Sequence, residues 1–180
     1  MFIKQINKSL ETAVLFGEID IDKVETTLKK LSKAGQESRM VQLCSARYIV
    51  SHFHVFAATE QAAAAIDANT SNVKAPELEF LRRLTAERQI EKAISNSALA
   101  KGKNNACLVV VAKEGRAKKI AENAAKETGF KESNIDFSEN APAAKKFFKI
   151  SDKELETLSD LENPLEAAII ERIALLGISQ

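Results

Sequence analysis

The chain has 180 residues, of which 45% are hydrophobic and 28% are charged. This composition supplies enough apolar side chains for a core and excludes wholesale disorder. The net charge of +1 excludes a strongly cationic, histone-like protein, and two cysteines exclude a disulfide scaffold or a four-cysteine zinc module. The apolar runs are too short to span a bilayer, and the first residues lack the apolar core of a signal peptide. We therefore predict a soluble, cytoplasmic protein with a single domain over residues 1–180.

Charge is unevenly distributed along the chain. Residues 151–180 hold two bases and seven acids, a net charge of −5, so residues 1–150 carry +6. A basic body with an acidic end can offer one face to an anion and another face to a different partner. Solvated helix faces that differ in sign explain the same numbers equally well.

Apolar periodicity and turn residues predict more helix than strand. In chain order the predicted elements are a strand at 12–19, a helix at 22–34, a strand at 40–46, helices at 51–68, 76–85 and 87–100, a strand at 106–112, a helix at 115–128, a loop at 131–144, a strand at 146–150, and helices at 151–158 and 165–178. The strand at 106–112 is apolar on both faces, so we expect it near the centre of the sheet. The predicted fold class is α/β (α+β): a small mixed or antiparallel central sheet packed with several helices, including a C-terminal helix.

Capping residues predict several of the helix boundaries. Side chains suited to N-caps precede three of the helices, at Ser51, Ser151 and Asn163. Glycines suited to helix ends follow three of them, at Gly35, Gly129 and Gly177. Prolines stand at first helical positions at Pro76 and Pro164.

Signals for catalysis or metal binding are weak. Glycine patterns for phosphate or dinucleotide binding are missing, and the spacing of His52 and His54 does not suit a helical zinc site. Cys44 and Cys107 lie in apolar predicted strands, where a thiol acts as a small hydrophobe. We therefore predict no catalytic residue, metal or cofactor. A small metabolic enzyme that uses His52, His54 and Glu60 as acid–base groups is the alternative.

A cluster of arginines marks the junction between two predicted helices. Arg82, Arg83 and Arg88 flank Thr85, where a second helix is expected to begin. A helix N-terminus with guanidinium groups beside it can hold a nucleic-acid backbone or a terminal nucleotide. Four glutamates in the same segment nearly cancel the charge, so ordinary pairing on exposed helices is the competing interpretation.

The last predicted helix is apolar nearly all round. Within it only Glu166, Glu171 and Arg172 are polar before Gly177. Such a helix has to be covered on more than one face, either by a partner or by the core of its own domain.

The order of these segments resembles a known family. The likeness covers nearly the whole chain: an N-terminal strand and helix, then a strand that leads into HFHVFAATEQA, followed by ELEFLRRLTAERQIEKAI, ACLVVVA and the C-terminal ISDKELETLSDLENPLEAAIIERIALLGI. They resemble the small subunit of the KEOPS complex, the kinase-binding TPRKB family, in its archaeal form. The most specific parts are residues 79–94 and the helix after Asn163-Pro164, whereas residues 131–145 show no likeness.

The resemblance implies a non-enzymatic role. Members of this family bind and stimulate the small atypical kinase/ATPase of KEOPS and help to recruit tRNA, in archaea through the single-stranded 3′ CCA end. The complex makes threonylcarbamoyladenosine in tRNA, and its catalytic centre lies on another subunit. A protein-only scaffold without RNA binding is the alternative that keeps the kinase partner.

The two segments singled out above supply the expected binding residues. For tRNA these are Lys74, Arg82, Arg83, Arg88, Gln89 and Lys92. For the kinase these are Ile169, Ile170, Ile173 and Leu176. Five neighbouring apolar residues are assigned to the core instead: Leu78, Leu81, Leu84, Ile90 and Ile94. Arg88 either touches phosphate or pairs with a carboxylate inside the protein.

Overall fold

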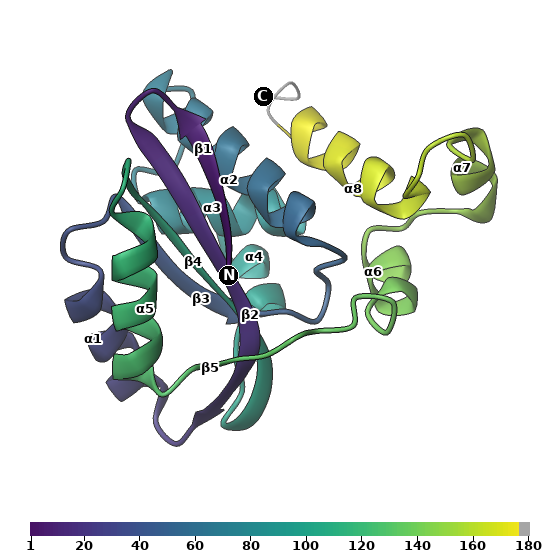
Figure 1. Cartoon of the computed structure of the whole chain (residues 1–180). Coiled ribbons are helices and arrows are strands. Elements are labelled where there is room, and N and C mark those ends of the chain that lie inside the picture. The colour runs from purple at the N-terminus through teal and green to yellow at the C-terminus, as the bar shows by residue number, and fades with distance from the viewer. Residues whose placement is uncertain (177–180) are drawn as a thin grey trace. The chain divides into compact units, whose positions relative to one another are not determined.

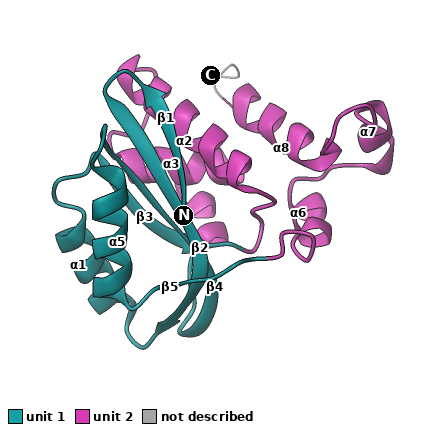
Figure 2. Cartoon of the chain, in the orientation of Figure 1, with its two compact units in different colours: residues 1–46, 98–135 teal, residues 47–97, 136–180 magenta. Residues whose placement is uncertain are grey.

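A computed structural model describes residues 1–176, and the contacts divide the chain into two compact units (Figure 2). Unit 1 consists of residues 1–46 and 98–135, and unit 2 consists of residues 47–97 and 136–180. The extent of the predicted single domain over 1–180 stays a prediction.

Unit 1 is built on an antiparallel five-stranded sheet (Figure 1). Its strands are β1 (Phe2–Asn7), β2 (Leu10–Ile21), β3 (Met40–Ser45), β4 (Gly102–Lys113) and β5 (Lys131–Glu132). The strand order is β1-β2-β4-β3, and β5 pairs with β2. The central place predicted for the strand at 106–112 is therefore confirmed, and so is the α+β class with an antiparallel sheet.

Helices α1 (Val24–Ala34) and α5 (Ala117–Thr128) lie side by side against this sheet (Figure 1). Small residues of α5 and aliphatic residues of the strands form the core beneath them. Its fifteen buried members are Ala13, Leu15, Ile19, Ile21, Leu31, Leu43, Ala106, Leu108, Val110, Ala112, Ala117, Ile120, Ala121, Ala124 and Phe130. Of the three apolar residues on one face of α1, Leu31 is buried, whereas Val24 and Leu28 are 45% and 52% exposed.

Gly17 is required by the way β5 joins the sheet. It pairs with Glu132, and a Cβ atom at Gly17 would overlap the carbonyl oxygen of Lys131. Any larger residue there would push the two strands apart. The residue therefore allows the chain to return from α5 to the edge of β2.

Unit 2 is helical. Its helices are α2 (His52–Asp67), α3 (Pro76–Thr85), α4 (Ile90–Ser97), α6 (Ala141–Phe147), α7 (Asp152–Thr157) and α8 (Pro164–Leu175). The N-caps predicted from sequence are confirmed in three of them: the side chains of Ser51, Ser151 and Asn163 accept hydrogen bonds from the backbone N–H groups of His54, Glu154 and Glu166. Helix α8 packs on α2, α3 and α7.

Several predicted boundaries are wrong. Residues 146–150, predicted as a strand, form the end of α6 and the turn after it, and α6 itself lies partly in the segment predicted as a loop. Strand β1 was not predicted. Helix α4 begins at Ile90 rather than at residue 87, and Gly35 has φ −93° instead of a left-handed conformation. The predicted helix end at Gly177 lies outside the described residues.

Candidate functional site

A buried carboxylate holds the two central arginines of the predicted tRNA-binding segment. Glu79 on α3 is fully buried, and its Oε2 and Oε1 lie 2.7 Å from Arg82 NH1 and Arg83 Nε, respectively. Ser71 Oγ donates a third hydrogen bond to Oε2 at 2.9 Å. The spacings of three and four residues place both arginines above Glu79 on one helix face. Arg82 and Arg83 are themselves only 5% and 2% exposed, so this ion cluster belongs to the interior of unit 2.

The same two arginines tie neighbouring segments to α3. Arg82 Nε donates to the carbonyl oxygen of Arg88 at 3.2 Å, and Arg83 NH1 donates to the carbonyl oxygen of Ile173 on α8 at 3.4 Å. Between Arg83 and Arg88 the chain turns through Ala86, whose φ of 49° is left-handed. The Glu79 cluster therefore positions both the α3–α4 turn and helix α8.

The six residues predicted to bind tRNA fall into two groups. All six lie in unit 2, but Arg82 and Arg83 are enclosed and paired with Glu79, and a macromolecule on the surface cannot reach their guanidinium groups. The exposed members are Lys74, Arg88, Gln89 and Lys92. Whether either group binds tRNA stays a prediction, but only the second group offers side chains to a partner.

A pocket of about 300 Å³ opens beside Arg88, and we call it the Arg88 pocket. Its lining residues come from the α3–α4 turn, the end of α6 and the end of α8: Thr85, Ala86, Glu87, Arg88, Phe147, Phe148, Lys149, Arg172, Leu175 and Leu176. The pocket thus brings together Arg88 from the predicted tRNA set and Leu176 from the predicted kinase set. Arg172 is held in place by Glu154, with NH1–Oε1 and NH2–Oε2 distances of 2.6 and 2.9 Å. The exposed cations at this pocket are Arg88 and Lys149.

Burial separates the four predicted kinase contacts on α8. Ile169 and Ile173 are fully buried and Leu176 is 6% exposed, so these three belong to the core of unit 2. Ile170 is half-buried, and Leu175 is 48% exposed. Leu175 is therefore an exposed apolar side chain of α8 and Ile170 a partly exposed one, and their spacing of five residues places them on opposite flanks of the outer side of the helix. Among the five apolar residues assigned to the core, Ile94 is 44% exposed, so that assignment is wrong.

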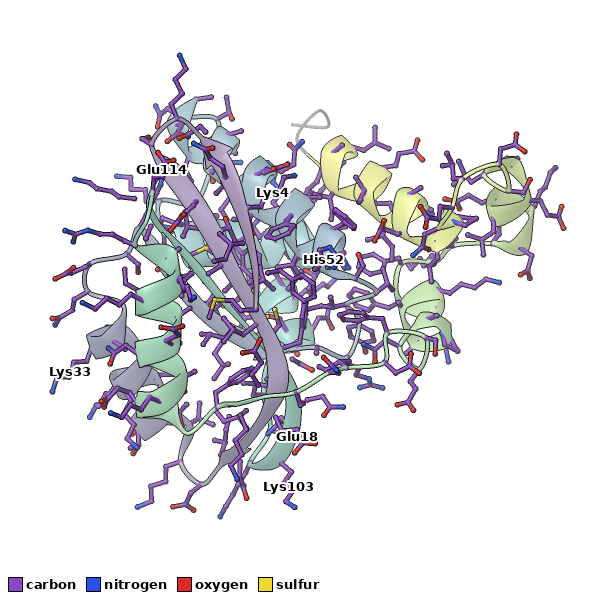
Figure 3. The ribbon with its side chains drawn as sticks, in the orientation of Figure 1. Lys4, Glu18, Lys33, His52, Lys103 and Glu114 are labelled. Carbon is purple, nitrogen blue, oxygen red and sulfur yellow. The ribbon has the colours of Figure 1, made fainter. Side chains whose placement is uncertain are left out.

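The two histidines occupy different environments. His54 is fully buried, its Nε2 lies 3.0 Å from the carbonyl oxygen of Leu84, and its Nδ1 has no hydrogen-bond partner among the described residues. Burial lowers the pKa of His54 to about 4, partly offset by the hydrogen bond to Leu84. His52, at the N-terminal end of α2, is half-buried (Figure 3). Burial lowers its pKa as well, and the Glu166 carboxylate acts in the opposite direction. The geometry does not support His54 as an acid–base group because a substrate cannot reach its ring.

Acidification is expected to destabilise the protein through His54. The pKa of this histidine rises from about 4 in the folded chain to its ordinary 6.5 on unfolding, so the unfolded chain binds the extra proton. The stability that the buried, neutral His54 contributes is therefore fully present above pH 6.5 and is lost as the pH falls from 6.5 towards 4. Between pH 7.5 and 5 we expect the free energy of unfolding to fall by about 2 kcal/mol more in the wild type than in His54→Gln. Urea unfolding at both pH values measures the difference, and equal losses in the two proteins would contradict it.

The two cysteines are directly opposed across β3 and β4. Both are buried, they are register partners, and Cys44 Sγ lies 3.7 Å from the carbonyl oxygen of Cys107. Burial, with a contribution from Cys44, raises the pKa of the Cys107 thiol. Both thiols are therefore core groups rather than nucleophiles.

Within residues 1–176 no cluster of three or more metal-ligating side chains occurs, and no helix is long and apolar enough to cross a membrane.

Comparison with protein families identifies the family. Residues 19–177 match the family model of kinase binding protein CGI-121. The chain belongs to this family. The match begins inside β2 and includes helices α1–α8, and it confirms the family indicated by the sequence resemblance. No curated protein matches the chain at a significant level.

In this CGI-121 family member, sequence reasoning missed two residues of the candidate site. Lys149 lies in a segment that the sequence predicts as a strand, and Leu175 is not among the predicted kinase contacts. The signal for Leu175 was available in part, because a helix that is apolar all round has more than one face to offer. Nothing in the local pattern indicated that the end of α6 meets the α3–α4 turn.

Proposed function

We propose that the protein is a non-catalytic subunit of an archaeal-type KEOPS complex in the cytoplasm. In this role it binds and stimulates the small kinase/ATPase subunit and recruits tRNA through the 3′ CCA end for threonylcarbamoyladenosine synthesis. The observation that carries the proposal is the match of residues 19–177 to kinase binding protein CGI-121. The buried state of His54 and the core position of both cysteines agree with a binding role.

The surface we propose for the kinase is the outer side of α8. Leu175 supplies an exposed apolar side chain and Ile170 supplies a half-buried one. Large exposed apolar side chains are the kind of group that a partner covers at the centre of an interface. Ile169 and Ile173 support this surface from below rather than forming it.

The surface we propose for tRNA is the exposed part of the α3–α4 turn with the Arg88 pocket. Arg88 and Lys149 offer charge at the pocket, and Phe147 offers aromatic surface. Cations beside aromatic and apolar side chains suit a single-stranded nucleotide, whose phosphate is charged and whose base is flat. A pocket of about 300 Å³ has the size for one terminal nucleotide.

Charge reversal at Arg88 is expected to weaken tRNA binding. In fluorescence anisotropy at low salt, Arg88→Glu should bind tRNA about tenfold more weakly than the wild type because a phosphate contact becomes a repulsion. Lys153→Glu, an equal change at an exposed residue of α7, is the matched control and should stay within about threefold of the wild type. Equal affinities for Arg88→Glu and Lys153→Glu would remove the Arg88 pocket from the tRNA site.

The CCA end is tested with the same assay. Intact tRNA should bind more tightly than tRNA trimmed of its CCA end, and the difference should disappear in Arg88→Glu. Equal binding of intact and trimmed tRNA would contradict recognition of the CCA end.

The protein-only scaffold remains the second candidate because of the charges around the junction. Outside the Glu79 cluster, residues 74–92 hold three cations and three carboxylates: Lys74, Arg88, Lys92, Glu77, Glu87 and Glu91. The exposed part of the segment therefore has no net charge that would attract a polyanion. Kinase binding without any tRNA binding at low salt would favour the scaffold.

A further inference from the structure

The charge of the protein is sorted between the two units, and the excess of positive charge lies in unit 1. Unit 1 contains 15 basic and 10 acidic residues, a net charge of +5, whereas unit 2 contains 11 basic and 15 acidic residues, a net charge of −4. The segments of α1 and α5 with their flanks, residues 23–37 and 113–131, hold ten basic and five acidic residues. Their net charge of +5 equals that of the whole unit.

A groove of about 600 Å³ runs along these two helices, and we call it the α1–α5 groove. It is lined by the end of α1, the turn before α5 and the first half of α5: Lys33, Ala34, Gln36, Glu37, Gly115, Arg116, Lys119, Ile120 and Asn123. Lys33 extends outward from α1 (Figure 3). Lys33 and Lys119 are exposed and make no ion pair among the described residues.

The carboxylate in the groove holds its arginine only weakly. Arg116 NH1 lies 2.8 Å from Glu37 Oε2, but the two side chains are 60% and 73% exposed. Exposed pairs of this kind contribute little to stability and exchange readily for other partners. Exposed lysines continue the positive surface along both helices, at Lys29, Lys30, Lys118 and Lys126.

The lining favours a phosphate backbone over an acidic protein. Its two apolar residues are withdrawn, since Ile120 is 8% exposed and Ala34 is half-buried. Interfaces between proteins are depleted in lysine and need exposed apolar anchors, and the exposed Val24 and Leu28 of α1 lie outside the lining. Gln36 and Asn123 add amide groups that can bond to phosphate and 2′-hydroxyl oxygens. Lys, Asn and Gln are among the side chains that contact the phosphates and sugars of nucleic acids. Double-stranded RNA is bound mostly through its shape and through such phosphate and 2′-hydroxyl contacts, without sequence readout.

We infer that the α1–α5 groove binds the phosphodiester backbone of double-stranded RNA. The site is distinct from the Arg88 pocket, because it lies in unit 1 and recognises a paired stem rather than a single-stranded end. It shares its class of ligand with the proposed function and rests on it for the identity of tRNA as the natural ligand. It does not rest on the CCA end, so the two can fail separately.

The test uses a labelled blunt RNA duplex of about 16 base pairs, which has no single-stranded end. In fluorescence anisotropy with the full chain, the double variant Lys33→Glu/Lys119→Glu should bind the duplex about tenfold or more weakly than the wild type. The slope of log affinity against log salt should become shallower by about two. The matched control is Lys101→Glu/Lys103→Glu, which makes the same charge change in unit 1, just before β4 and at its second residue. Figure 3 labels Lys103. The control should stay within about threefold of the wild type.

Each other outcome overturns the inference. Equal weakening by both double variants would mean diffuse attraction to the unit and no site in the groove. Binding of polyglutamate in place of the duplex, abolished by Lys33→Glu/Lys119→Glu, would assign the groove to an acidic protein. Circular dichroism and thermal melting of each variant establish that it is folded. CCA-dependent tRNA binding, measured separately, reports on the proposed function alone.

Discussion

Replacing Glu79 with alanine is expected to lower the free energy of unfolding by about 3–5 kcal/mol. The substitution would leave the guanidinium groups of Arg82 and Arg83 buried without their counter-ion. It would also remove the acceptor of Ser71 and loosen the bonds that join α3 to the Arg88 carbonyl and to α8. Urea unfolding followed by circular dichroism measures the loss.

Glu77→Ala provides the control for this prediction. Glu77 lies on the first turn of the same helix, is half-buried, and has no ion pair among the described residues. Its replacement should change the free energy of unfolding by less than about 1 kcal/mol. Similar losses for the two variants would show that Glu79 is not the centre of a buried cluster.

The burial of Arg82 and Arg83 also decides which variants can test tRNA binding. Because Arg82 and Arg83 are structural, replacing both with glutamate would report on folding, whereas Arg88→Glu reports on binding.

Leu175→Glu is expected to weaken kinase binding about 100-fold while leaving the protein folded. Leu175 is 48% exposed on α8, so a charged side chain there stays in water in the free protein and would be buried without a partner in the complex. Calorimetric titration with the kinase measures the affinity, and thermal melting checks the fold.

Ile173→Glu, two residues earlier on the same helix, should behave in the opposite way. Ile173 is fully buried and its carbonyl oxygen accepts a hydrogen bond from Arg83. A carboxylate at this position should unfold unit 2 or destabilise it by more than about 4 kcal/mol. A folded Ile173→Glu variant that no longer binds the kinase would instead place Ile173 at the interface. Unchanged kinase affinity in Leu175→Glu would remove the outer side of α8 from the site.

The parts of the fold that could be predicted are those in which local chemistry and tertiary packing agree. The strand around Val109 is apolar on both faces and is buried on both. The caps at Ser51, Ser151 and Asn163 form because the side-chain oxygen meets a backbone N–H three residues later, whatever surrounds the helix.

The end of α6 could not be predicted because its stop signal is not glycine. Lys149 adopts a left-handed φ of 55°, and the N–H of Ile150 bonds to the carbonyl oxygen of Lys145 across the end of the helix. Ala86 ends α3 in the same way, with the N–H of Glu87 bonded to the carbonyl oxygen of Arg82. Glycine normally marks this motif in a sequence, and neither position has one. Without a glycine to indicate the end of the helix, the apolar run around Phe148 has the pattern of a strand.

The spacing of Glu79, Arg82 and Arg83 permits pairing along one helix face, but it does not show that these side chains are buried. Arginines three and four residues after a glutamate look the same on an exposed helix and on a buried one. Whether the arginines are exposed or buried depends on which segments pack over α3. The spacing of residues along one helix carries no information about those tertiary contacts. The same limit applies to α8. An apolar helix must be covered over much of its surface, but the sequence does not show which of its residues stay exposed.

Calorimetric titration of the wild-type chain into the small kinase/ATPase of its own complex tests whether this CGI-121 family member is a kinase-binding subunit. We expect a one-to-one complex with a dissociation constant of about 1 μM or tighter, and a negative heat-capacity change from burial of apolar surface around Leu175. Absence of any association at concentrations of about 100 μM, with both proteins folded, would contradict it.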